Sequence, residues 1–194
     1  LLGKTKFVES YYKQYRFSYD NSPFYGCDNL FEVELDKGIE KIPNITFSYL
    51  PSLRSVKATT SLKRIDSEAF LGCSSLEVFN GSSSVTNIGD NAFNGCSSLV
   101  GPLELNHAEI IGVRAFNGCG LLSGDLILQR LEYLGDNAFN SCSSLTSAVT
   151  HQLKNMGASA FEGCISLREC VIDGESTIGN KVFAGCTSLE KIKL

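Results

Sequence analysis

Apolar residues recur along the chain in three columns that repeat every 22 or 23 residues. The first column is a phenylalanine, a cysteine or leucine follows three residues later, and a leucine follows three residues after that. The phenylalanines are Phe24, Phe47, Phe70, Phe93, Phe116, Phe139, Phe161 and Phe183. Six of the copies share the motif Ala/Val-Phe-x-x-Cys-x-x-Leu. So many similar units indicate a stacked array in place of one globular core.

A unit of this length is too small to bury its own apolar face, whereas stacked units bury one another's faces. A fourth apolar column ends each unit, and five of its seven residues precede a glycine. Its members are Ile42, Ile65, Ile88, Ile111, Leu134, Met156 and Ile178. The periodicity therefore predicts a solenoid whose core runs along the whole stack.

Each leucine of the third column opens a stretch in which apolar and polar residues alternate, as in residues 30–35. Side chains two residues apart share one face of a strand, so Val33 and Leu35 point inward while Glu32 and Glu34 point outward. One strand per unit predicts a β-dominated superhelix with one parallel sheet of about eight strands. The opposite side of each unit is expected to carry short helical or 3₁₀ turns, with a second short strand as the alternative.

Two local features follow from the residues between the strands. Asp90 and Asp136 precede an Asn-Ala-Phe-Asn sequence, and we expect each to cap a single helical turn. The strands of the fourth and fifth units start one residue late, at Gly101-Pro102 and Gly124-Asp125. A shift of one residue predicts a local bulge at both places.

The Ala-Phe-x-x-Cys-x-x-Leu motif and its 22–23-residue period resemble the BspA-like, or Treponema pallidum-type, leucine-rich repeat. The resemblance covers residues 24–194 and implies a right-handed β/α leucine-rich repeat solenoid. The chain departs from the family pattern in two ways: Leu50 replaces a motif cysteine, and the proline that usually follows the strand is mostly absent. Neither change alters the predicted fold.

The predicted organisation is a stack of repeats with an atypical first segment. Residues 24–194 form eight repeats, the last of them truncated, while residues 1–23 lack the motif and contain six aromatic residues. Because an uncapped solenoid exposes its core, we interpret residues 1–23 as an N-terminal cap. A tyrosine-rich binding patch is the alternative interpretation of this segment.

Composition narrows the functional classes. The net charge is −4 and no block of Lys or Arg occurs, which argues against nucleic acid as the partner. No apolar run is long enough to span a membrane, so no membrane insertion is expected in this segment. The chain has no CxxC, HxxxH, P-loop or GxGxxG motif, and we therefore expect no enzyme activity, no cofactor and no metal.

The repeated residues themselves are interpreted as structural. The seven motif cysteines are expected to fill bends as free buried thiols that donate weakly to backbone carbonyls. Cys170 is expected to be buried and inert, and His107 and His151 to be ordinary exposed residues. The predicted structural core comprises Phe47, Phe70, Phe93, Phe116, Phe139, Phe161, Cys73, Cys96, Cys119 and Cys142.

Binding is expected on the outward side of the strands, because repeat proteins usually bind through an extended surface. The candidate residues are Glu32, Glu34, Ser55, Lys57, Val78, Asn80, Glu104, Ile127, Ser147, Glu169, Val171, Lys191 and Lys193. The resemblance implies a non-enzymatic recognition module of a cell-surface or secreted protein, adhering to matrix proteins such as fibronectin or fibrinogen or mediating cell–cell aggregation. A structural spacer or an intracellular scaffold is the alternative, and free thiols leave a cytoplasmic location open.

Overall fold

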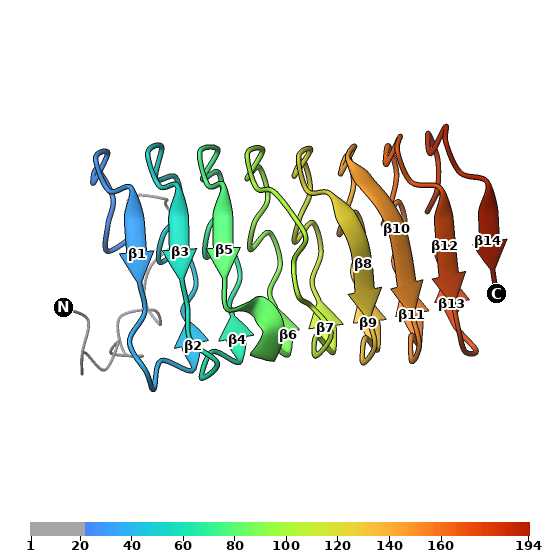
Figure 1. The fold of residues 1–194 in the computed structure, drawn as a ribbon, viewed down its shortest axis with the longest axis horizontal. Helices are drawn as coiled ribbons and strands as arrows, with labels where there is room; N and C mark the ends of the chain where they lie inside the picture. The colour runs from blue at the N-terminus through green and yellow to red at the C-terminus, as the bar shows by residue number, and fades with distance from the viewer. Residues whose placement is uncertain (1–21) are drawn as a thin grey trace.

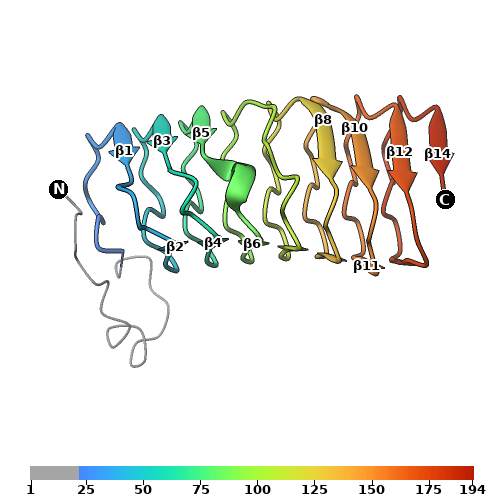
Figure 2. The ribbon, with the colours of Figure 1, turned by 60° about the horizontal axis from the view of Figure 1, so that its bottom comes forward.

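The chain folds as a stack of parallel turns, which confirms the predicted solenoid. The computed structural model describes residues 22–194 and shows successive turns side by side along one axis (Figure 1). Most turns carry strands on two different sides of the stack, as the second view shows (Figure 2). Residues 1–21 lie outside the described part of the chain, so the N-terminal cap stays a prediction.

The first side carries the strands that follow the leucine column. They are β1 (Glu32–Glu34), β3 (Ser55–Lys57), β5 (Val78–Asn80), β8 (Gly124–Leu128), β10 (Leu145–Thr150), β12 (Glu169–Ile172) and β14 (Lys191–Lys193). All pairings are parallel, and neighbouring turns are in register, with Val33 opposite Val56 and Val56 opposite Phe79. These paired residues alternate with exposed neighbours, as the sequence predicts.

The predicted single sheet is divided in two by the fourth repeat. β1, β3 and β5 form a three-stranded sheet, and β8, β10, β12 and β14 form a four-stranded one. Between them, residues 100–105 form no strand; Pro102 follows a cis peptide bond and has no N–H to donate. The predicted bulge at Gly124-Asp125 is found as a register shift, in which Thr146 of β10 is the extra residue.

A second sheet of seven strands occupies another side of the stack. Its strands are β2 (Lys41–Ile42), β4 (Arg64–Ile65), β6 (Asn87–Ile88), β7 (Ile110–Ile111), β9 (Tyr133–Leu134), β11 (Asn155–Met156) and β13 (Thr177–Ile178). Each contributes one residue of the fourth apolar column. The glycine after this column lets adjacent turns approach closely, because a Cβ on Gly135 would lie 2.5 Å from backbone atoms of Gly112 and Val113.

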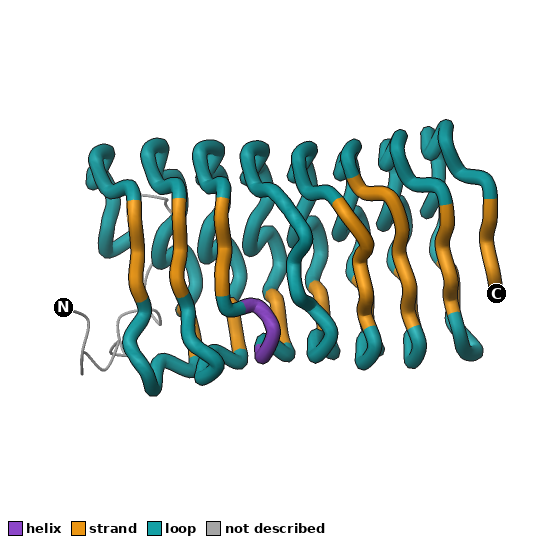
Figure 3. Tube along the Cα trace, in the orientation of Figure 1, coloured by secondary structure: helices purple, strands orange, loops and turns teal. Residues whose placement is uncertain are grey.

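The turns before each phenylalanine differ from the predicted helical turns. Within residues 22–194 the helical content is the 3₁₀ turn η3 (Ser82–Ser84), drawn purple in Figure 3. Residues two before the phenylalanines, such as Asn91 and Arg114, are left-handed, with φ near 54° and 53°. Their N–H groups donate to carbonyl oxygens of the next turn; the Asn91 N–H, for example, donates to the Val113 oxygen over 2.8 Å. These N–H groups are therefore not available for hydrogen bonds within a helical turn.

The carboxylates of Asp90 and Asp136 also bond to the next turn. Asp90 accepts the N–H of Val113 over 2.8 Å, and Asp136 accepts the N–H of Ala158 over 2.7 Å. The expected N-caps are therefore bridges between turns. A carboxylate so placed satisfies a backbone donor that its own turn leaves free.

The core is a continuous column of phenylalanine rings. The rings from Phe24 to Phe183 stack with centroids 5.1–6.0 Å apart and planes within 3–16° of parallel. Phe79 of β5 packs edge-on against both Phe70 and Phe93, at 5.6 and 5.2 Å. The six phenylalanines of the predicted core lie fully buried, as do Cys73, Cys96, Cys119 and Cys142. This column fixes the spacing at which each turn presents its outward side chains.

Candidate protein-binding face

The outward side chains of β1, β3, β5, β8, β10, β12 and β14, together with Glu104, form a surface that we call the strand face. The strands present it because alternate residues are drawn into the core: Val33 and Leu35 are buried, while Glu32 and Glu34 are exposed. All thirteen residues of the predicted face lie exposed or half-buried on it. The fourth repeat separates the face into an N-terminal and a C-terminal part.

The N-terminal part of the strand face is organised by an ion pair between adjacent turns. The Lys57 ammonium lies 2.5 Å from the Glu32 carboxylate, and Ser55 donates to the same carboxylate over 3.4 Å. The hydrogen bond and charge of Lys57 lower the pKa of Glu32, and Glu32 in turn raises the pKa of Lys57. Val78 and Asn80 extend this part onto β5, with Asn80 opposite Lys57.

The C-terminal part of the strand face carries an apolar row. The strand register places Ile127, Val149 and Val171 opposite one another on β8, β10 and β12. Ile127 is 40% exposed, and the two valines are half-buried. Because each side chain comes from a different turn, the row lies across the strands, along the axis of the stack.

A polar row lies beside the apolar one. The register places Asp125, Ser147, Glu169 and Lys191 opposite one another. Ser147 donates to Asp125 over 2.6 Å, and Lys191 pairs with Glu169 over 2.5 Å. The sequence singled out three of these residues and missed Asp125, because the one-residue bulge hides its outward position.

A small charged cluster borders this part of the strand face. Asp173 lies 3.1 Å from the His151 ring and 3.8 Å from the Lys193 ammonium, so it joins three neighbouring turns. The sequence interpretation missed Asp173, which lies just beyond β12. His151 and His107 are both exposed, but His151 has this partner.

Two acidic residues of the strand face lack an ion pair of their own in the described part of the chain: Glu104, and Glu34, which lies opposite Lys57 and whose charge helps to raise the pKa of Lys57. Glu104 lies in the fourth repeat between buried Leu103 and Leu105, and so it points outward without belonging to a strand. Within residues 22–194, the side chains of Glu34 and Glu104 form no hydrogen bond or ion pair. Their carboxylates are therefore available to a cation from outside the chain.

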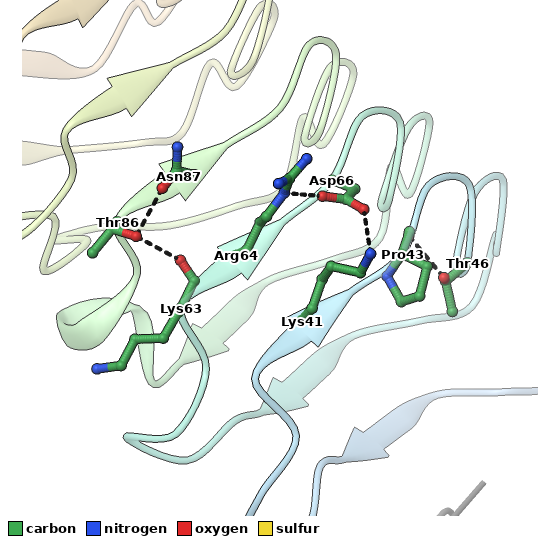
Figure 4. A network of polar contacts seen from close by, with 8 residues as sticks. All are labelled: Lys41, Pro43, Thr46, Lys63, Arg64, Asp66, Thr86 and Asn87. Carbon is green, nitrogen blue, oxygen red and sulfur yellow. Dashed lines mark hydrogen bonds and ion pairs between the residues drawn. The ribbon is translucent and has the colours of Figure 1, made fainter. Parts of the chain in front are cut away.

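The outward side of the seven-stranded sheet carries its own polar network (Figure 4). The buried carboxylate of Asp66 pairs with Arg64 of its own turn and with Lys41 of the previous turn, the latter over 3.5 Å. The Thr86 hydroxyl lies within hydrogen-bonding distance of the Lys63 carbonyl oxygen, at 3.2 Å, and of the Asn87 side-chain oxygen, at 2.8 Å. Sequence reasoning did not single out this surface, whose two-residue strands are too short to show alternation.

Six of the eight cysteines are buried, while Cys186 is half-buried and Cys27 is exposed, so two motif cysteines depart from the predicted burial. Burial raises the pKa of Cys73, Cys164 and Cys170 to about 12, and it also raises the pKa of Cys96, Cys119 and Cys142 well above the ordinary value, so these thiols stay protonated. Within residues 22–194, no three His, Cys, Asp or Glu side chains form a set that could hold a metal ion. In the same described range, no helix is long and apolar enough to cross a membrane.

Comparisons with known proteins agree with this architecture. The model of the BspA type leucine rich repeat region matches residues 17–100 and 102–194, with six copies. No curated protein matches the chain. Among solved structures, a leucine-rich repeat protein from Bacteroides ovatus is similar, with a TM-score of 0.72 and 28% identity over 86% of this chain and 46% of its own length.

The Treponema pallidum leucine rich repeat protein is a second similar structure. It has a TM-score of 0.69 and 26% identity, covering 82% of this chain and 78% of its own. The chain thus spans less than half the length of the Bacteroides ovatus protein but most of the Treponema pallidum one. The family model accounts for nearly all of the described residues, and the chain belongs to the BspA-type leucine-rich repeat family.

Proposed function

We propose that the chain is a non-enzymatic module that recognises a protein partner through its strand face. The observation that carries the proposal is the apolar row of Ile127, Val149 and Val171, bordered by the polar row on neighbouring positions of the same strands. Apolar centres with polar rims are typical of protein–protein interfaces. The leucine-rich repeat fold itself suggests protein binding, in keeping with this surface.

The proposal extends to the kind of partner that the module binds and to the location of the protein. By its resemblance to the BspA-like family, the module belongs to a cell-surface or secreted protein and adheres to host matrix proteins such as fibronectin or fibrinogen, or mediates cell–cell aggregation. The unpaired carboxylates of Glu34 and Glu104 would add charge complementarity toward a partner with basic side chains.

Binding is tested by presenting the purified chain to immobilised fibronectin, fibrinogen, laminin and collagen at two salt concentrations. Saturable binding to one of them that weakens with salt is expected, because rim charges are screened. Absence of binding to all four would contradict adhesion to matrix proteins. It would favour the alternative of a structural spacer or scaffold.

Two matched variants locate the binding surface. Ile127→Glu places a charge in the apolar row of the strand face, where the side chain is 40% exposed. Ile110→Glu places the same charge on the seven-stranded sheet, where the side chain is 42% exposed. We expect only the first to weaken binding, by about tenfold or more if Ile127 lies at the centre of the contact. Equal effects, or a larger effect of the Ile110 variant, would contradict binding through the strand face.

A further inference from the structure

The chain contains three copies of the tripeptide Phe-Asn-Gly, at residues 79–81, 93–95 and 116–118, each followed by serine or cysteine. Asn-Gly is the dipeptide most prone to spontaneous deamidation, because glycine lacks a Cβ that would hinder attack by its backbone nitrogen. With the same residues on either side, the three copies have closely similar intrinsic chemistry. Any difference in their reactivity must come from the fold.

In two of the three copies, hydrogen bonds hold both the asparagine side chain and the glycine nitrogen. Asn94 donates to Asn91 over 3.0 Å and accepts a hydrogen bond from Asn117 over 3.1 Å, so both amides are held. The nucleophilic nitrogens are held as well. Gly95 donates to the Asn117 oxygen and Gly118 donates to the Asn140 oxygen, each over 2.9 Å. Attack at either site requires these inter-turn bonds to open.

At Asn80 and Gly81 the main-chain oxygen of Asn80 accepts the Ala58 N–H over 2.9 Å, but the two groups that react are not held by any hydrogen bond among the described residues. Asn80 is the last residue of β5, lies exposed on the strand face, and its side chain has no hydrogen-bond partner within residues 22–194. In the same part of the chain, the Gly81 N–H has no acceptor. The 3₁₀ turn η3 follows directly and leads the chain away from the strand (Figure 3).

The fold also requires the glycine that makes the pair reactive. Gly81 has a left-handed φ of 96°, and a Cβ there would lie 2.5 Å from the Ala58 carbonyl oxygen. A side chain at this position would meet backbone that cannot move aside. The reactive dipeptide therefore cannot be removed by substituting Gly81 without disturbing the turn.

We propose that Asn80 is a site of spontaneous modification, where the side-chain amide is converted to aspartate and isoaspartate. The Gly81 nitrogen attacks the Asn80 Cγ, loses its proton, and expels the side-chain amide as ammonia to leave a cyclic imide. Water then opens the imide at either carbonyl. Attack at Cγ restores the backbone as aspartate, and attack at the main-chain carbonyl gives isoaspartate; water is the only co-reactant.

The modification places a charge on the strand face. The new carboxylate stands opposite Lys57, which already pairs with Glu32 across the adjacent turn. The isoaspartate product also adds a methylene to the main chain at the end of β5. The N-terminal part of the strand face therefore changes charge and shape with the age of the molecule.

The test is a time course of the folded chain in mildly alkaline buffer, followed by peptide mass mapping of all three Phe-Asn-Gly peptides. Loss of ammonia and gain of water raise the peptide mass, and methylation by an isoaspartate-specific carboxyl methyltransferase counts the isoaspartate product. We expect Asn80 to react at least about tenfold faster than Asn94 or Asn117, because the latter sites must break hydrogen bonds first. Comparable rates at the three sites in the folded chain would overturn the proposal.

Two controls separate the fold from the local sequence. In denaturant the three peptides should react at similar rates, and a persistent advantage of Asn80 there would overturn the structural explanation. Asn80→Gln should remove the reaction at this position while leaving Asn94 and Asn117 unchanged, because the longer side chain forms the imide ring poorly. Methylation that persists undiminished in this variant would place the reaction elsewhere in the chain.

Discussion

The thiol of Cys119 donates a hydrogen bond over 3.2 Å to the carbonyl oxygen of Phe93, which lies 26 residues earlier in the previous turn. The same contact recurs from Cys73 to Phe47 and from Cys142 to Phe116. The phenylalanine and the cysteine of the motif are therefore hydrogen-bonded to each other between turns. This contact is the backbone donation predicted from the sequence, and it gives the cysteine a role that a plain apolar residue could not fill.

Burial of these thiols predicts their reactivity. Desolvation raises the pKa of Cys119, so its reactive thiolate is scarce at neutral and mildly alkaline pH. We expect alkylation of the folded chain to modify exposed Cys27 first and half-buried Cys186 more slowly, and to spare the six buried cysteines until the chain unfolds. Mass mapping after a timed reaction with iodoacetamide measures the order. Labelling of Cys119 as fast as Cys27 in folded protein would show that the stack opens readily.

The strand side of the fold could be predicted because its signal is local. Alternation around Val33 and Leu35 identifies both the strand and its buried face, and the phenylalanine column gives the period. The seven-stranded sheet could not be found in this way, since a strand such as Lys41–Ile42 is too short to alternate. Its pairing depends on contacts between turns, which only the stacked structure supplies.

The conformation of the turns before the phenylalanines could not be predicted either, because it also depends on contacts between turns. Asn91 and Arg114 adopt left-handed backbone although neither is glycine, at a cost of roughly 1–2 kcal/mol each. Their hydrogen bonds to the next turn offset that cost, and those bonds are tertiary. The residues of the candidate face could be predicted wherever apolar and polar residues alternate along a strand. Asp125 was missed where the bulge in β10 shifts the register.

Because adjacent turns approach closely at some glycines and not at others, replacing two of the glycines by alanine should change the free energy of unfolding by different amounts. Gly135→Ala would place a Cβ 2.5 Å from Gly112 and Val113 backbone atoms, and we expect it to lower the free energy of unfolding by about 1–3 kcal/mol. Gly120→Ala meets nothing closer than 3.5 Å and should change that free energy by no more than about 0.5 kcal/mol. Urea denaturation measures both. Equal effects of the two variants would contradict the tight packing at Gly135.

The ion pair between Glu32 and Lys57 predicts a pH dependence on the strand face. Lys57 lowers the folded-state pKa of Glu32 below the ordinary value of 4.5, so the pair is present above that value and is lost as the pH falls through the lowered pKa. Lys57→Met should therefore raise the pKa of Glu32, as followed by NMR titration of its side chain. Lys191→Met, which removes a pair in a distant turn, should leave it unchanged. If the pKa of Glu32 were the same in the Lys57→Met variant, the ion pair would not persist in solution.

The phenylalanine column makes the strongest prediction about stability. Phe116 is fully buried, and its ring stacks on Phe93 and Phe139 with both centroids 5.1 Å away. Phe116→Ala should lower the free energy of unfolding by about 3–5 kcal/mol, because it removes buried apolar surface and leaves a cavity in a core with little freedom to collapse. Urea denaturation followed by circular dichroism measures the loss.

The Phe116→Ala substitution should also change the shape of the unfolding transition. Each turn contacts only its neighbours, so a cavity at Phe116 weakens the coupling between the turns on either side of it. We expect the transition of the variant to broaden or divide, as the two halves of the stack unfold with less cooperation. Phe183→Ala is the matched control, because Phe183 is half-buried and packs on Phe161 at 6.0 Å, and it should cost less than the central substitution. A central variant no less stable than this control would contradict the view that the rings form the spine of the stack.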